Sequence, residues 1–230
     1  MTARTTLSIA FFLIQLYGLY GQVKPAPDRA EGTGPFPQLI IRGATLINGT
    51  GSPPFGPVDI VIENNRIMSI EEVGFPGAPI DSSDRPKLKS NGTELDANGM
   101  YVLPGFIDMH GHIGGRAQGA DAEYVYKLWM AHGITTIRDP AAGNGLSWVL
   151  NEKKRSAENK ITAPRILAYT VFGAGEEDPI TDDAGARAWV QKNAKNGADG
   201  IKFFGAPPEV MAAALEENKK LGLRSACHHA

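Results

Sequence analysis

The spacing of hydrophobic residues after residue 99 alternates between two periods. Short apolar runs typical of strands lie near 101–110, 134–139, 165–172, 199–204 and 223–228. Between them, apolar residues recur at helical spacing near 121–132, 145–158, 182–196 and 208–221. Strands that alternate with helices in this way predict a parallel sheet with crossover helices, here with five strands.

Two of the predicted helices show which face packs against that sheet. The first places Ala122, Val125, Leu128 and Trp129 on one side. The fourth does the same with Val210, Ala214 and Leu221. We interpret both sets as core faces.

The region from Gln38 to residue 100 has a different pattern. Its apolar runs are short and turn-bounded, at 39–41, 45–47, 59–63 and 66–70. Asn64 and Asn65 separate the last two runs, and asparagine tolerates the positive φ that a two-residue hairpin requires. A small antiparallel sheet is predicted, followed by an exposed loop without chemistry at 74–92, where neither period is present.

Residues 1–21 have the pattern of a signal peptide. Arg4 supplies a positive charge, residues 7–19 are mostly apolar, and Gly18 and Gly21 offer cleavage points. The apolar run is too short for a transmembrane helix of about 20 apolar residues. We therefore expect a secreted or periplasmic protein, with an uncleaved N-terminal anchor as the alternative. Residues 22–37, rich in glycine and proline, are predicted to be a linker.

Charge excludes several classes of partner. The 230 residues include 23 Lys and Arg against 25 Asp and Glu, a net charge of -2, and 42% are hydrophobic. Nucleic-acid binders and polybasic membrane-surface proteins carry an excess of positive charge. We therefore expect no nucleic-acid partner, and no membrane partner after signal cleavage. The single cysteine, Cys227, cannot form an internal disulfide bond.

The strongest chemical signal is His110-Gly111-His112 at the end of the strand predicted near 101–110. Residues two apart in a strand point to the same side, so both imidazoles project together. Imidazole nitrogen binds zinc and similar ions at about 2.0–2.1 Å. The pair is half of a metal site, or a histidine pair that only forms hydrogen bonds.

Lys202 is the second candidate, because it lies among large apolar residues of a strand. Burial of an isolated ammonium costs on the order of several kcal/mol. A desolvated, neutral lysine can react with carbon dioxide to form a carbamate, which is an oxygen ligand. The alternative is a lysine that extends to solvent at the strand end.

Three further positions are weaker candidates. Of His228 and His229, only one can face the site, and His228 is favoured. Cys227 is expected to be a small buried hydrophobe rather than a thiolate ligand. Arg138-Asp139 either contributes charge to a pocket or forms a surface ion pair, and His132 is expected to be a solvated helix cap.

These motifs resemble the amidohydrolase superfamily, particularly its imidazolonepropionase- and prolidase-like branch. The resemblance runs from Gln38 to the C-terminal end, through 43–47, 103–112, 133–139, Lys202 and His228. It implies an α/β fold: a partial TIM (β/α)8 barrel of about five strands at 101–230, preceded by part of a small β-sandwich at 38–100.

The resemblance also implies a ligand set. His110 and His112 would bind one metal ion, a carboxylated Lys202 would bridge to a second, and His228 would bind the second. Two zinc ions per full-length chain are expected, although manganese, iron and cobalt suit the same donors. No other cofactor is expected. The family's catalytic aspartate would lie beyond residue 230, so this chain is expected to be the N-terminal, inactive part of a longer enzyme.

The implied activity is hydrolysis of an amide or related carbon–nitrogen bond by a metal-bound hydroxide. The substrate would be a small amide, such as an X-Pro dipeptide or a cyclic amide. Assembly of the protein into a homo-oligomer is left open by the sequence. Two alternatives remain: a mononuclear deaminase, which lacks the bridging lysine in this family, and a truncated homologue that acts as a binding or scaffold protein.

Overall fold

The computed structural model describes residues 23–80, 83–114 and 119–228. The described chain forms two compact units. The β unit comprises Arg29–Phe106, and the α/β unit comprises the described residues from Ile107 onward together with residues 23–28. The signal peptide predicted at 1–21 lies outside the described residues.

The β unit is one mixed sheet. Its strands are β1 (Gln38–Leu46), β2 (Phe55–Glu63), β3 (Arg66–Glu72), β4 (Thr93–Asp96) and β5 (Tyr101–Val102). β1–β2 and β2–β3 pair antiparallel, with φ of 46° and 64° at Asn64 and Asn65 in the predicted hairpin. The predicted antiparallel pairing of the runs up to residue 70 is confirmed, and β4 and β5, which were not predicted in this sheet, pair parallel to β1.

The core of the β unit contains one buried ionic cluster. Asp59 is fully buried and accepts hydrogen bonds from Arg42 (2.7 Å), Arg85 (2.6 and 2.9 Å) and the Gly43 backbone N–H (2.9 Å). Burial opposes ionisation of Asp59, but these hydrogen bonds outweigh it and lower its pKa. Arg85 comes from the predicted loop, whose role is therefore to complete this cluster.

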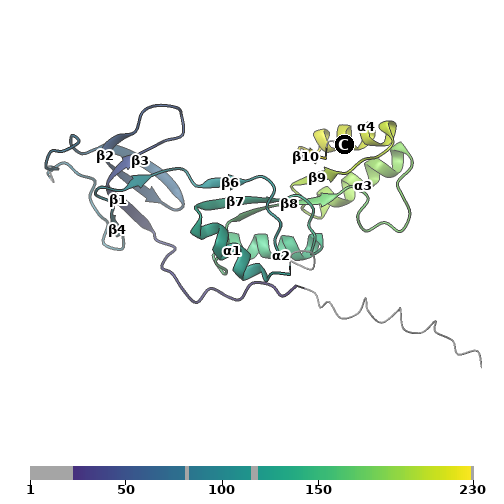
Figure 1. Ribbon diagram of the computed structural model, residues 1–230, viewed down its shortest axis with the longest axis horizontal. Coiled ribbons are helices and arrows are strands. Elements are labelled where there is room, and N and C mark those ends of the chain that lie inside the picture. Colours follow the sequence, from purple (N-terminus) through teal and green to yellow (C-terminus); the bar gives the residue numbers. More distant parts are fainter. Residues whose placement is uncertain (1–22, 81–82, 115–118, 229–230) are drawn as a thin grey trace, which may run out of the picture. The chain divides into compact units, whose positions relative to one another are not determined.

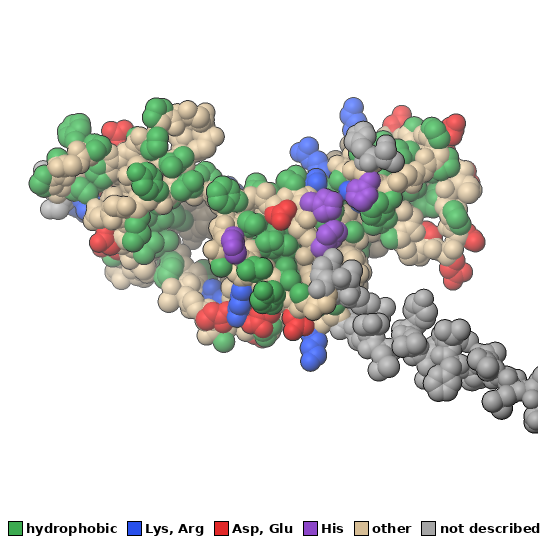
Figure 2. Space-filling model, in the orientation of Figure 1, with side chains coloured by type: hydrophobic (Ala, Val, Ile, Leu, Met, Phe, Trp, Pro, Cys, Tyr) green, Lys and Arg blue, Asp and Glu red, His purple; other side chains and the backbone are tan. Residues whose placement is uncertain are grey.

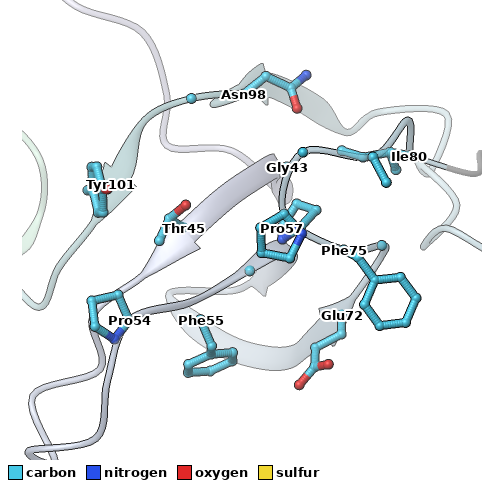
Figure 3. Close-up of a pocket in the computed structure, with 16 residues that line it drawn as sticks. Gly43, Thr45, Pro54, Phe55, Pro57, Glu72, Phe75, Ile80, Asn98 and Tyr101 are labelled. Atoms are coloured by element: carbon cyan, nitrogen blue, oxygen red, sulfur yellow. The ribbon is translucent and has the colours of Figure 1, made fainter.

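A cavity of about 690 Å³ lies within the β unit, between β1, the turn before β2 and the loop after β3 (Figure 3). Its lining is dominated by glycine, proline and aromatic side chains, including Phe55, Phe75 and Tyr101. Figure 3 shows Asn98 on its rim. None of the four predicted metal ligands lines this cavity.

The α/β unit confirms the predicted alternation. Its strands are β6 (Phe106–Asp108), β7 (Ile134–Asp139), β8 (Arg165–Val171), β9 (Gly200–Phe203) and β10 (Arg224–Cys227). Its helices are α1 (Ala122–Ala131), α2 (Leu146–Ala157), α3 (Asp183–Lys195) and α4 (Pro208–Lys220). The sheet order is β10-β9-β8-β7-β6, and the β7–β8, β8–β9 and β9–β10 pairings are parallel. The sheet is a curled, five-stranded part of a barrel, as predicted.

The helices cover one face of this sheet (Figure 1). Ile137 of β7 packs with α1 and α2 in one buried cluster, and Ile201 and Phe203 of β9 pack with α3 and α4 in another. None of the helices within residues 23–80, 83–114 and 119–228 is long and apolar enough to cross a membrane.

Three details of the predicted α/β region were wrong. The strand predicted at 101–110 is divided, because Tyr101–Val102 pairs with β1 in the β unit and only Phe106–Asp108 joins the barrel sheet. On α1, Tyr126 is fully buried while Leu128 is 45% exposed, so the buried face is rotated from the predicted one. Similarly, Leu221 follows the end of α4 and is exposed.

Residues 23–28, inside the predicted linker, are packed against α2. Ala26 is buried, and its N–H donates to Glu152 at 3.0 Å. The Trp148 indole donates to the Val23 carbonyl at 3.0 Å, and Arg155 pairs with Asp28 at 2.9 Å. This part of the predicted linker therefore belongs to the α/β unit.

Candidate metal centre

Strand register places Lys202 on the open face of the barrel sheet. Its neighbours Ile201 and Phe203 face the helices, so Lys202 points to the opposite side. Ala226 of β10 pairs with Lys202 and shares that side, as does His228 two residues later. The predicted choice of His228 over its neighbour is consistent with this register, and His229 lies outside the described residues.

Lys202 is 3% exposed, which contradicts the alternative of a side chain that extends to solvent. Its ammonium lies 5.8 Å from the centroid of the Phe204 ring. Among the described residues, no carboxylate forms an ion pair with it. A buried cation without an anionic partner is costly to keep, so this position suits a lysine with a chemical role.

His110 and His112 reach the same face from a turn rather than from the strand itself. β6 ends at Asp108, whose carboxylate accepts the His110 backbone N–H at 2.8 Å. The two imidazole centroids are 5.2 Å apart, with an angle of 71° between the ring planes. Two imidazoles on one tetrahedral zinc ion, with Zn–N of about 2.0–2.1 Å, have centroids about 5 Å apart. The distance between the two rings therefore matches that of two ligands on one divalent ion.

Glycine is required between the two histidines. A Cβ at Gly111 would lie 2.9 Å from the Trp129 ring of α1 and 3.4 Å from the Asp108 carboxylate. The close approach of the turn to α1 therefore depends on the absence of a side chain at Gly111.

His228 is the third imidazole near the pair. Its ring is stacked with that of His110 at 6.3 Å between centroids, and it contacts Phe204 edge-on at 4.6 Å. Figure 2 shows histidine side chains beside lysine and arginine side chains on this unit. Within the described residues, however, no three His, Cys, Asp or Glu side chains converge closely enough to hold a metal ion.

The electrostatics of the cluster favour neutral imidazoles. Burial lowers the pKa of His110, and the charges of Lys202, His112 and Arg138 lower it further. Burial and Lys202 also lower the pKa of His228. A neutral imidazole is the form that binds a metal ion.

Asp139, at the end of β7, lies next to His112. Its carboxylate is 3.8 Å from His112 Nδ1 and is 1% exposed, so the alternative of a surface ion pair was wrong. Burial raises its pKa to about 6, against hydrogen bonds from the backbone N–H groups of Ala141 and Ala142. The sequence indicated a charge here but not its contact with His112.

Two other predictions concern residues beside the cluster. Cys227 is exposed, which contradicts the expectation of a buried hydrophobe, because its side of β10 is not covered by the described residues. His132 is exposed at the C-terminal end of α1, where its Nδ1 lies 2.7 Å from the Leu128 carbonyl. Its predicted role as a helix cap is confirmed.

No family model matches the chain, but several known proteins are similar to part of it. The chain is 28% identical over 135 residues to an N-acyl-D-aspartate deacylase of Alcaligenes xylosoxydans xylosoxydans, covering 58% of this chain and 24% of the deacylase. It is 31% identical over 102 residues to an imidazolonepropionase of Picrophilus torridus, covering 44% of this chain and 21% of that protein. Dihydroorotases and adenine deaminases also match. The chain spans about a quarter or less of these relatives.

Solved structures share the fold. A Xaa-Pro dipeptidase with bound methionine superposes with a TM-score of 0.58 at 24% identity, over 83% of this chain and 56% of the dipeptidase. Other neighbours with this fold include a molinate hydrolase, with a TM-score of 0.61 over 90% of this chain. The sequence relatives and the shared fold together support a relationship to the amidohydrolase superfamily.

Proposed function

We propose that this chain forms part of a metal-dependent hydrolase that cleaves carbon–nitrogen bonds in small amides. One observation carries the proposal. Four side chains lie toward the C-terminal ends of β6, β9 and β10. They are two imidazoles with the spacing of a shared ligand pair, a third imidazole, and a buried lysine that has no anionic partner in the described chain. The C-terminal ends of barrel strands are where active sites of this fold are built.

The chemistry of the donors fits one or two divalent ions. His110 and His112 would hold one ion, and His228 would contribute to a second. Zinc suits imidazole and carbamate donors, so zinc is the proposed metal. Bound ions would supply Lewis acidity, which lowers the pKa of a water molecule and polarises the scissile carbonyl.

Lys202 would connect the two positions as a carbamate. The lone pair of the neutral amine would form an N–C bond to carbon dioxide while one C=O π pair moves onto oxygen. The amine proton would pass to water, which leaves an anionic carbamate. The carbamate would also supply the anionic partner that Lys202 lacks within the described residues.

The relatives define the substrates to test first. They include deacylases of N-acyl amino acids and a Xaa-Pro dipeptidase, so N-acyl amino acids and X-Pro dipeptides are the proposed class. Metal content and hydrolysis of these substrates should be measured on the purified protein and on its His110→Ala and His112→Ala variants. The proposal expects bound zinc that both substitutions remove, and it fails if the unaltered protein binds no divalent metal.

Adenine deaminases among the relatives support a second candidate, a deaminase with one metal ion. The metal count separates the two. Two ions per chain that fall to one in Lys202→Ala favour the hydrolase, whereas one ion that Lys202→Ala leaves in place favours the deaminase.

A further inference from the structure

The last two residues of β7, Arg138 and Asp139, have no part in the function proposed so far. β7 lies next to β6 in the sheet, and β6 leads directly into the turn that carries the histidine pair. Both residues contact that turn, and they do so in different ways.

Asp139 faces one nitrogen of His112. Its Oδ1 lies 3.8 Å from Nδ1, and no other positively chargeable side chain forms an ion pair with it among the described residues. Asp139 is 1% exposed and accepts the Ala141 backbone N–H at 3.2 Å, and a proton on Nδ1 of His112 would present a further positive dipole to this buried carboxylate. That tautomer leaves the lone pair on Nε2, which is then the nitrogen available to a metal ion.

Arg138 holds the backbone on both sides of His110. Its carbonyl accepts the Gly111 N–H at 3.0 Å, and its Nε donates to the Met109 carbonyl at 2.6 Å. The guanidinium lies over the Tyr169 ring of β8, 5.2 Å from the ring centroid. Because a planar guanidinium is fixed by both contacts, it restricts the turn more than a flexible ammonium would.

We propose that Arg138 and Asp139 are positioning residues for the histidine pair: Arg138 fixes the turn at 109–111, and Asp139 selects the Nδ1-protonated form of His112. Ligands whose second nitrogen faces a carboxylate are oriented and made more basic by it. This inference rests on the metal centre of the proposed function.

The main experiment measures zinc affinity by chelator competition for the unaltered protein and for Asp139→Asn. The variant keeps the size of the side chain and removes its charge, so affinity should fall about 10- to 100-fold. Glu152→Gln is the matched control, because Glu152 is an equally buried acid of the same unit that contacts Ala26 and Arg155 instead of the histidines. The control should lower thermal stability and leave zinc affinity unchanged.

A second measurement distinguishes positioning from support of the fold. Nitrogen-15 NMR of the metal-free protein should show His112 with a proton on Nδ1, and Asp139→Asn should shift the equilibrium toward the other tautomer. An unaltered protein with the proton on Nε2 would overturn the inference even if the variant does not fold. Arg138→Lys should weaken zinc binding several-fold while the backbone bond to Gly111 is retained.

The failures of the two proposals are distinguishable. If the unaltered protein binds no zinc, the proposed metal centre fails. If it binds zinc through His110 and His112 but Asp139→Asn and Arg138→Lys bind equally well, only the positioning inference fails.

Discussion

The two units treat a buried charge in opposite ways. In the β unit, Asp59 is fully buried and accepts hydrogen bonds from Arg42, Arg85 and a backbone N–H. In the α/β unit, Lys202 is 3% exposed and has no ion pair among the described residues. Burial of either charge carries a desolvation cost. Only the charge of Asp59 is compensated by partners among the described residues of its own unit. The first charge therefore has a structural role, and the second suits chemistry with a ligand.

The largest expected effect is the loss of the Asp59 carboxylate. Asp59→Ala leaves Arg42 and Arg85 without their buried partner, so the free energy of unfolding should fall by about 3–5 kcal/mol. Urea denaturation of the variant and the unaltered protein measures this. Lys154→Ala is the control, because it removes an exposed ion pair with Glu158. If Asp59→Ala lowers the free energy of unfolding no more than Lys154→Ala does, the structural role of Asp59 is contradicted.

Lys202→Met should have the reverse effect on stability. In protein stripped of metal ions, it replaces a buried lysine that has no ion pair among the described residues by an apolar side chain of similar length. The free energy of unfolding of the metal-free protein should therefore rise by about 1 kcal/mol or more. The metal content of the protein as purified should fall. A variant that is less stable and keeps its full metal content would show that Lys202 is structural, like Asp59.

Gly111→Ala tests the turn between the two histidines. The added methyl group would meet the Trp129 ring at 2.9 Å, so it should cost about 1–3 kcal/mol and weaken metal binding. Gly143→Ala is the control, because a Cβ there has no atom within 4 Å. Equal melting temperatures and equal zinc affinities for the two variants would contradict the close approach.

Acid should weaken the β unit through Asp59. Its folded pKa is lowered, so the stability it contributes is present above the unfolded value of about 3.9 and is lost as pH falls through the folded pKa. Denaturation midpoints measured from pH 6 to pH 2 should fall on the acidic side. In Asp59→Asn the denaturation midpoint should decrease less between pH 6 and pH 2. If the variant and the unaltered protein lose stability equally in acid, Asp59 is not the group responsible.

The smallest expected change is the removal of the signal peptide predicted at residues 1–21, through which we propose that the protein is exported. Because Val23 accepts the Trp148 indole N–H and Ala26 is buried against α2, processing should leave residue 23 in the mature chain. N-terminal sequencing of the secreted or periplasmic protein should therefore begin at or before Val23. A cytoplasmic protein with residues 1–21 intact would remove the export proposal.

The sequence alone determined the architecture of the α/β unit, because strand and helix periodicity are local properties. All four helices and four of the five barrel strands lie within a few residues of their predicted positions. It also identified the candidate ligands, since residue type and strand position limit which side chains share a face. The hairpin at Asn64 and Asn65 was likewise readable, because positive φ selects few residue types.

Only the tertiary structure decided which distant residues meet. Tyr101–Val102 pairs with β1 instead of continuing the predicted barrel strand. Arg85, from a loop without a hydrophobic period, binds Asp59, and Asp139 faces His112. Each outcome depends on contacts between residues far apart in the chain, whose free energies no local pattern contains. The periodicity of the chain therefore predicted the elements, whereas packing decided their partners and the surroundings of each buried charge.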